Sequence, residues 1–330
     1  MPMQTQLLTV NARAPEASCL AQAAAVLRVG GLVAFPTETV YGLGAHALDP
    51  RAVARIFAAK GRPATNPLII HVPDVAAALP LIRDFPPLAR ALTDHFWPGS
   101  LTLVLPKSER VPDLITAGGA TVALRVPAHP VALGLLRVCG LPLAAPSANP
   151  SGLLSPTTAA HVLHGLDGKI DLVLDAGPTP GGLESTVLDV TVTPPRLLRP
   201  GLVTAEQIEA VVGPIEREAA RDETAPRRSP GLHERHYAPR TTLECVADGR
   251  RHVAELQRQG VRVGWVTMGE DTSTADMIVE RLPADAEGYA AGLYAALHRL
   301  DQAGVERIVV DMAPIDDAWL AVRDRLCRAA

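Results

Sequence analysis

The chain has 330 residues, of which 48% are hydrophobic and 20% charged, so it is long enough for two globular domains and does not have a disordered composition. Its net charge of −4 argues against a chain built mainly to bind nucleic acid, so any anion site must be local. The four cysteines (Cys19, Cys139, Cys245 and Cys327) form no CxxC pair, which indicates free thiols in a reducing compartment and argues against structural zinc.

No stretch predicts a targeting or membrane segment. Residues 1–10 lack the apolar centre of a signal peptide. The most apolar stretch, residues 131–146, is interrupted by Arg137 and two prolines. We therefore expect a cytoplasmic protein.

In the first 212 residues, short apolar runs alternate with stretches of helical periodicity, which predicts an α/β unit. We expect strands over residues 6–10, 31–35, 68–72, 101–105, 121–127 and 141–145, with two more after the glycines of 181–189 and before Arg199. We expect helices over residues 14–29, 50–59, 86–96, 155–163 and 204–212. Ser155 is predicted as the N-cap of its helix with Pro156 at the first position, and Thr204 with Gln207 predicts a capping box.

The stretch from residue 35 to residue 72 has the outline of a binding site. After the strand that ends at Pro36 the chain turns polar, and two glycines, Gly42 and Gly44, would let the backbone approach a ligand closely. The helix that follows ends at Gly61 with cations on both sides, Lys60 and Arg62. These cations could instead complement the helix dipole, and the polar residues before them could be ordinary turn residues.

Four features suited to anions lie on loops at predicted strand ends. They are Lys60 with Arg62, Arg125, the segment 147–155, and Arg199. Arg125 sits in an apolar strand and needs an anionic partner, either an internal carboxylate or a bound acid. A nucleotide together with an amino acid would use all four, although residue types alone do not choose this pair. The Walker A, dinucleotide-binding, HExxH and GxSxG patterns are absent from the sequence.

The composition changes after residue 212. Residues 213–240 alternate in charge and carry recurrent prolines, which predicts a linker, but residues 229–239 are rich in aromatic and cationic groups. They are therefore either a plain spacer or part of the site. Beyond them, strands are expected over 242–246, 261–266 and 307–311, with helices over 249–258, 285–303 and 317–328. This alternation predicts a smaller α/β unit with a largely parallel sheet, in which the lone histidines 252 and 298 are structural.

The motifs, taken together, resemble those of the YrdC-like family of threonylcarbamoyl-AMP synthases in its long, two-domain form. The resemblance rests on the segments 36–44, 60–63, 66–68, 97–99, 125–127, 147–149, 184–187 and 199–201, and on the linker segment 229–239. It implies a YrdC-like twisted mixed sheet with helices over residues 1–212, a linker or lid over 213–240, and a Rossmann-like C-terminal α/β domain over 241–330.

The resemblance also implies a reaction. L-threonine, bicarbonate and ATP would give L-threonylcarbamoyl-AMP and pyrophosphate, and a tRNA threonylcarbamoyltransferase machinery would use the product to make threonylcarbamoyladenosine at tRNA adenosine 37. By the family pattern, four residues would contact threonine: Thr39, His71, Arg125 and Ser185. Nine would surround ATP, which would bring Mg²⁺: Lys60, Arg62, Asn66, Thr121, Ala145, Ser147, Ser155, Arg199 and Tyr237. Lys60 and Arg62 would be catalytic by stabilising charge, with no side-chain nucleophile and no metal ligands from the protein.

The linker departs from the pattern at His233 and Glu234, where family members often carry basic or aromatic residues. We expect Glu234 to point away from the ligand, and residues 229–239 to act as a lid that ligand orders. Three other functions remain open at this point: carbamoyl-adenylate chemistry as in hydrogenase maturation proteins, a nucleotide sensor, and an RNA-binding module with weak tRNA contact.

Overall fold

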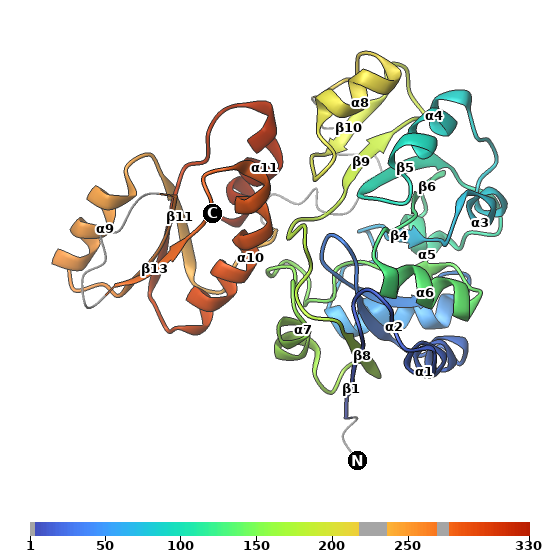
Figure 1. The fold of residues 1–330 in the computed structure, drawn as a ribbon, viewed down its shortest axis with the longest axis horizontal. Helices are drawn as coiled ribbons and strands as arrows, with labels where there is room; N and C mark the ends of the chain where they lie inside the picture. The colour runs from blue at the N-terminus through green and yellow to red at the C-terminus, as the bar shows by residue number, and fades with distance from the viewer. Residues whose placement is uncertain (1–3, 218–235, 269–276) are drawn as a thin grey trace.

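The computed structural model describes residues 4–217, 236–268 and 277–330, and they form two α/β domains, each around its own sheet (Figure 1). The larger sheet has ten strands in the order β1-β8-β2-β3-β7-β4-β6-β5-β9-β10. It contains both parallel and antiparallel pairs, so the expected mixed sheet is confirmed. Its strands are β1 (Gln6–Thr9), β2 (Val33–Pro36), β3 (Tyr41–His46), β4 (Ile69–His71), β5 (Leu101–Pro106), β6 (Thr121–Arg125), β7 (Leu143–Ala144), β8 (Leu172–Asp175), β9 (Thr186–Asp189) and β10 (Arg196–Arg199).

Helices cover both faces of the larger sheet, because its central strands are buried on both sides. Along β2, Val33 and Phe35 pack with α1 and α6, whereas Ala34 points to the opposite face and packs with α2 and α7. This alternation is the period of two expected of a strand. The helices are α1 (Ala17–Arg28), α2 (Pro50–Lys60), α3 (Val75–Ala78), η1 (Leu79–Leu81), α4 (Pro87–Phe96), α5 (Asp113–Thr116), α6 (Pro130–Cys139), α7 (Ala159–Leu166) and α8 (Ala205–Val212).

Helix ends follow the expected chemistry at two places. Gly61 ends α2 in the left-handed region, with φ +59°. Thr204 and Gln207 form the capping box of α8, with each side chain accepting from the other residue's backbone N–H. Both predictions are confirmed.

The prediction that Ser155 begins a helix is wrong. The helix in this region, α7, begins at Ala159, and its N-cap is Thr158, whose hydroxyl accepts from the backbone N–H of His161. The segment Ser-Pro-Thr-Thr offers several capping hydroxyls, and the fold uses the last one because Ser155 is bonded elsewhere.

Several elements were not expected from the sequence. The polar, glycine-containing stretch after β2 continues as a strand, β3, which pairs antiparallel with β2. Gly42 of this strand lies at the pocket described below, but Gly44 serves packing, since a Cβ atom there would lie 2.7 Å from the Phe35 ring. Strand β8, the short helices α3 and α5, and the longer helix α6 were also missed. Helix α6 is apolar on most sides, so its sequence has little helical periodicity to read.

The smaller domain has four parallel strands in the order β11-β14-β12-β13, which confirms the expected parallel sheet. The sequence did not predict β13. Its elements are β11 (Thr242–Val246), α9 (Gly249–Arg258), β12 (Val263–Thr267), β13 (Ile278–Arg281), α10 (Ala286–Gln302), β14 (Arg307–Asp311), η2 (Asp317–Trp319) and α11 (Leu320–Ala329).

Helices α10 and α11 face the larger domain (Figure 1), and the two domains share a hydrophobic cluster. Val40, Leu154 and Leu183 of the larger domain belong to the same buried cluster as the core of the smaller one. Gly182, with φ +71°, lies against α10 so closely that a Cβ atom would sit 2.3 Å from the carbonyl oxygen of Ala290. The domains are therefore packed tightly against each other.

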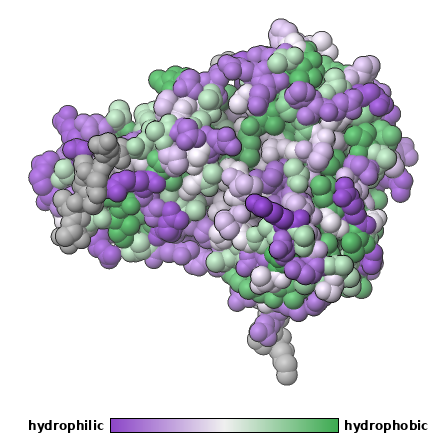
Figure 2. Space-filling view, viewed as in Figure 1, coloured by the Kyte–Doolittle hydropathy of each residue, from purple (hydrophilic) through white to green (hydrophobic). Residues whose placement is uncertain are grey.

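None of the helices in the described part of the chain is long and apolar enough to cross a membrane. The face in Figure 2 is hydrophilic over both domains and is interrupted by small apolar patches.

Candidate active site

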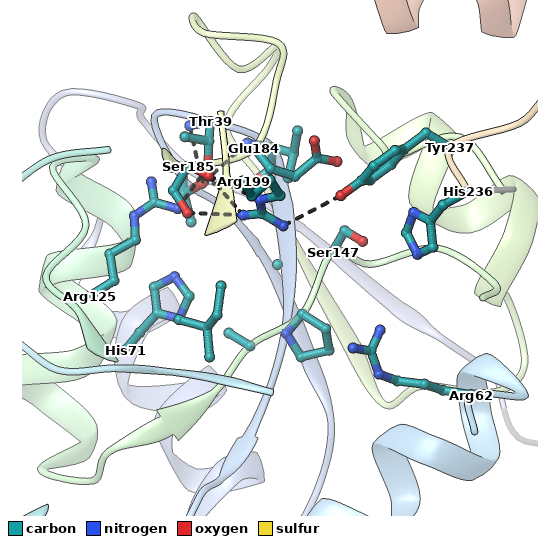
Figure 3. Close-up of a pocket in the computed structure, with 16 residues that line it drawn as sticks. Thr39, Arg62, His71, Arg125, Ser147, Glu184, Ser185, Arg199, His236 and Tyr237 are labelled. Atoms are coloured by element: carbon teal, nitrogen blue, oxygen red, sulfur yellow. Dashed lines mark hydrogen bonds between the residues drawn. The ribbon is translucent and has the colours of Figure 1, made fainter. Parts of the chain in front are cut away.

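One pocket collects most of the polar residues singled out in the sequence (Figure 3). Strands β3, β4, β6 and β10, the loops after β2, α2 and β7, the loop before β9, and the last part of the linker contribute to it. Its lining consists of Thr37, Thr39, Val40, Gly42, Arg62, Ile69, His71, Arg125, Ala145, Pro146, Ser147, Glu184, Ser185, Arg199, His236 and Tyr237.

Arg125 and His71 lie together on one side of the pocket because β4 and β6 are parallel neighbours with these two residues in register (Figure 3). The Arg125 guanidinium donates to Glu38 Oε1 at 2.5 Å, to Thr39 Oγ1 at 3.1 Å and to the Gly99 carbonyl at 3.1 Å. Burial raises the pKa of the Glu38 carboxyl, but Arg125 outweighs it, and the pKa lies below its ordinary value. Arg125 therefore has the internal carboxylate partner that the sequence left open. We call Arg125, Glu38, Thr39 and His71 the neutral side.

Three buried cations lie at the rest of the pocket: Arg62 and Arg199 line it, and Lys60 lies behind its wall. Lys60 donates to the carbonyls of Ser147 and Asn149, and Arg62 donates to those of Asn66 and Pro67. None of the ion pairs formed within the described residues includes these three cations. We call them, with Ser147 and Tyr237, the cationic side.

Burial is the main cause of the pKa shifts on the cationic side. It lowers the pKa of Lys60 well below the ordinary value, with a further contribution from Arg62. It also lowers the pKa of Arg62 to about 10, where Arg199 adds to the effect. Buried cations whose partners are only carbonyl groups have no opposite charge to balance them. Binding of an anion in this pocket would therefore be favourable.

Ser185 is bonded to the cationic side through Arg199. Its hydroxyl lies 2.8 Å from Thr102 Oγ1 and accepts from Arg199 at 3.1 Å, and its carbonyl also accepts from Arg199. Arg199 reaches further, to the Tyr237 hydroxyl at 3.4 Å. Tyr237 is buried and has φ +62°, an uncommon backbone conformation for a residue with a side chain.

His71 and Asn66 are buried side chains with polar atoms that have no hydrogen-bond partner among the described residues. These atoms are Nδ1 of His71 and both amide atoms of Asn66. Burial, reinforced by Arg125, lowers the pKa of His71 well below its ordinary value, so the ring is neutral and one ring nitrogen can accept a hydrogen bond. Unpaired buried polar groups are costly, which is typical of sites that a ligand completes.

Nine of the residues predicted from the sequence line the pocket, and four do not. Those that line it are Thr39, Arg62, His71, Arg125, Ala145, Ser147, Ser185, Arg199 and Tyr237. Lys60 lies behind it on carbonyls, Asn66 is buried beside Arg62, and Thr121 begins β6 with partial exposure. The Ser155 hydroxyl is bonded to Glu184.

The sequence did not single out Glu184 or His236 as site residues, although both line the pocket. The one sequence signal that could have found them is that each directly precedes a predicted site residue, Glu184 before Ser185 and His236 before Tyr237. Most of the expected lid, including Glu234, lies outside the described residues. Of its described part, Tyr237 closes one side of the pocket, and Ala238 donates its backbone N–H to the Gly152 carbonyl.

No group of three or more metal-binding side chains is found within residues 4–217, 236–268 and 277–330. The carboxylate of Glu184, which lines the pocket, and that of Glu38 beside it are each bonded to a buried arginine. The described residues thus offer no obvious ligand set of their own for a divalent cation.

Comparison with known proteins places this geometry in a family. A Sua5/YciO/YrdC model, described as telomere recombination, matches residues 25–201, and the model for the threonylcarbamoyl-AMP synthase C-terminal domain matches residues 203–330. The chain belongs to the threonylcarbamoyl-AMP synthase family. It is accordingly an enzyme of the nucleotidyltransferase type.

Relatives named threonylcarbamoyl-AMP synthase are similar over nearly the whole chain. The Bacillus subtilis relative is 47% identical over 321 residues, which cover 94% of this chain and 92% of that protein. The Pyrococcus abyssi relative is 46% identical over 321 residues, covering 93% of each. The match therefore includes both domains of the family's two-domain form.

Solved structures agree with the fold. The crystal structure of Pyrococcus abyssi Sua5 complexed with L-threonine has a TM-score of 0.91 at 45% identity, and the match covers 98% of this chain and 97% of that one. A second structure, of a double alanine variant of the same archaeal protein, has a TM-score of 0.90 at 43% identity, covering 98% and 96%. The chain therefore shares the fold of these structures in both of its domains.

Proposed function

We propose that this synthase makes L-threonylcarbamoyl-AMP from L-threonine, bicarbonate and ATP, with release of pyrophosphate. The observation that carries the proposal is the division of one pocket into a neutral side and a cationic side. A zwitterionic amino acid suits the side where Arg125 is already balanced by Glu38. A polyphosphate suits the side where Lys60, Arg62 and Arg199 have no carboxylate partner among the described residues.

On the neutral side, we propose that threonine is bound by Thr39, His71, Arg125 and Ser185. The Arg125 guanidinium would receive the amino acid carboxylate, because its planar fork matches that group. Nδ1 of His71 has no partner among the described residues, and in the neutral ring it either donates or accepts, depending on the tautomer, so it can bond to a polar group of the ligand such as the threonine hydroxyl. The L-threonine complex of the Pyrococcus abyssi relative supports threonine as a ligand.

On the cationic side, we propose that ATP is surrounded by Lys60, Arg62, Asn66, Thr121, Ala145, Ser147, Ser155, Arg199 and Tyr237. Lys60 and Ser155 would need to leave their present partners to touch it. Since the described residues form no metal cluster, Mg²⁺ would arrive on the triphosphate, where it supplies additional positive charge.

The reaction needs two bond-forming steps. The threonine amine attacks the carbon of bicarbonate, and water leaves to give a carbamate. A carbamate oxygen then attacks the α-phosphorus of ATP, and the bond from that phosphorus to the pyrophosphate oxygen breaks. Negative charge grows on the leaving pyrophosphate, so Lys60 and Arg62 would lower the barrier by binding that charge more strongly in the transition state. The residues mainly position and stabilise, and none serves as a nucleophile.

We further propose that the product serves threonylcarbamoyladenosine formation at tRNA adenosine 37 in the cytoplasm, through a separate transferase machinery. Residues 1–212 would form the catalytic domain, 213–240 the linker and lid, and 241–330 the supporting domain.

Pyrophosphate release from ATP and Mg²⁺ tests the proposal, with and without L-threonine and bicarbonate. Release that requires both compounds is the expected result. Release with neither would indicate plain nucleotide hydrolysis and contradict the proposal. Bound ATP with no release under any condition would favour a nucleotide sensor or, if tRNA bound in a salt-dependent manner, an RNA-binding module.

A further inference from the structure

Glu184 in the pocket wall is held by side chains from both domains. Its Oε2 accepts from Arg325 Nε at 2.7 Å and from the Tyr294 hydroxyl at 3.2 Å, and its Oε1 accepts from the Ser155 hydroxyl at 2.5 Å. Arg325 comes from α11 and Tyr294 from α10, both in the smaller domain. The smaller domain therefore supplies part of the electrostatic environment of the pocket.

Arg325 also contacts the elements on either side of Glu184. Its guanidinium donates to the Pro200 carbonyl at 3.0 Å, directly after Arg199, and lies 4.9 Å from the centre of the Tyr237 ring. It is 1% exposed and does not line the pocket, so it acts from behind the wall. A second carboxylate, Asp324, accepts from it at 2.6 Å.

The charge of Glu184 matters because Arg199 lies in the same wall. Burial alone would disfavour the ionised carboxylate, and Arg325 is the larger of the two arginine contributions that lower its pKa, ahead of Arg199. With Arg325 in place, the charge of Glu184 is balanced from behind the pocket wall. Glu184 then does not neutralise Arg199, whose charge remains available to a ligand. Without Arg325, the buried negative charge would face the pocket and would compete with a ligand for Arg199.

We propose that Arg325 is a positioning residue of the smaller domain, which neutralises Glu184 so that Arg199 and the cationic side can accept the phosphates of a nucleotide. This inference rests on the proposed function, since it takes ATP to be the ligand of that side. It gives the smaller domain a defined electrostatic part in nucleotide binding, in addition to its packing.

The experiment compares ATP–Mg²⁺ and L-threonine binding by calorimetry for the full chain and for R325M, E184Q and E184Q/R325M. R325M should bind ATP at least about tenfold more weakly because it leaves a buried carboxylate uncompensated, while threonine affinity changes by less than about threefold. The double variant E184Q/R325M should regain most of the ATP affinity, because it removes both charges. E184Q alone should bind ATP more tightly than the unmodified chain, because the wall then has an extra positive charge.

Arg217→Ala provides a matched control. Arg217, in the linker, also pairs with a carboxylate of the smaller domain, that of Asp317, but both side chains are at least a third exposed and neither lines the pocket. This variant should leave both affinities unchanged, since a solvated ion pair contributes little.

The possible outcomes are distinct. If the unmodified chain does not bind ATP, the proposed function fails and this inference fails with it. If the unmodified chain binds ATP but R325M binds it equally well, only the inference is overturned. If R325M does not fold, E184Q decides: tighter ATP binding supports the proposal, and equal weakening for ATP and threonine contradicts it.

Discussion

The buried cations on the two sides of the pocket are compensated in different ways. Arg125 has a carboxylate, Glu38, at 2.5 Å, and their charges cancel before any ligand arrives. Lys60 and Arg62 are bonded to backbone carbonyls, which carry only partial charges. The first arrangement has no net charge and favours a ligand without net charge. The second remains positive and favours an anion. Shape alone would not distinguish the two sides, but their charge does.

Lys60→Ala should have the largest effect. It removes one of the uncompensated cations, so pyrophosphate release should fall by about a hundredfold or more, as when a charge-stabilising group is removed from an active site. Threonine affinity should stay within about threefold, because Lys60 lies away from the neutral side. Steady-state kinetics and calorimetry measure the two quantities, with Lys107→Ala as control, since Lys107 pairs with Asp113 away from the pocket. Unchanged turnover would rule out the catalytic role.

Arg125→Lys should give the opposite pattern with a smaller effect. The variant keeps the charge beside Glu38 but loses the planar fork, so the KM for threonine should rise about tenfold while ATP affinity is retained. Competition binding with each ligand separately provides the measurement. If ATP and threonine binding weaken equally, the division of the pocket into two sides is wrong.

Mild acid should affect the domain interface before it affects the pocket carboxylates. His161 and His298 stack with ring centres 3.9 Å apart, and burial is the main cause that lowers their pKa values, to about 3 and about 4. Their pKa is 6.5 when unperturbed, so the unfolded chain takes up protons that the folded chain does not. The stability from these neutral rings is complete above 6.5 and is lost progressively as the pH falls towards 4.

Denaturant unfolding between about pH 7 and about pH 5 checks this prediction, with a His161→Gln/His298→Gln variant for comparison. The variant should lose less stability than the unmodified chain over this range. Equal slopes would show that the histidine pair does not control acid sensitivity. The pKa values of Glu38 and Glu184 lie below the ordinary 4.5, so both carboxylates stay ionised throughout.

Thr204→Ala should have the smallest effect and should change neither side of the pocket. It removes the capping box of α8 and should lower the free energy of unfolding by about 1 kcal/mol. Thermal unfolding measures this loss, and Thr204→Ser should restore most of it. A change in either ligand affinity would show that α8 is coupled to the pocket.

Local pattern predicted much of the fold. Strands 242–246 and 307–311 and helix 249–258 were predicted with the bounds observed, because short apolar runs and helical periodicity are local signals. Strand β3 was missed because its glycines and flanking polar residues resemble a loop. The N-cap of α7 was misplaced because neighbouring hydroxyls offer the same capping chemistry.

The site was predictable to the extent that its residues lie in short motifs. Arg125, Ser147, Ser185 and Arg199 were recognised from such motifs and line the pocket. Arg325 was not recognised, because it lies 141 residues from its partner Glu184 and occupies an ordinary amphipathic helix. A pairing across two domains leaves no spacing or periodicity in the sequence.

The contact at Gly182 constrains how the sequences of the two domains can change independently of each other. A Cβ atom there would lie 2.3 Å from one α10 carbonyl and 2.6 Å from another, so no side chain fits unless the helix moves. Helix α10 supplies Tyr294 to Glu184, and its displacement would disturb the pocket wall. A substitution at residue 182 could therefore persist only with compensating changes in the smaller domain. We expect the two halves to be inherited as a matched pair, and chimaeras that combine halves from distant relatives to fail first at this contact.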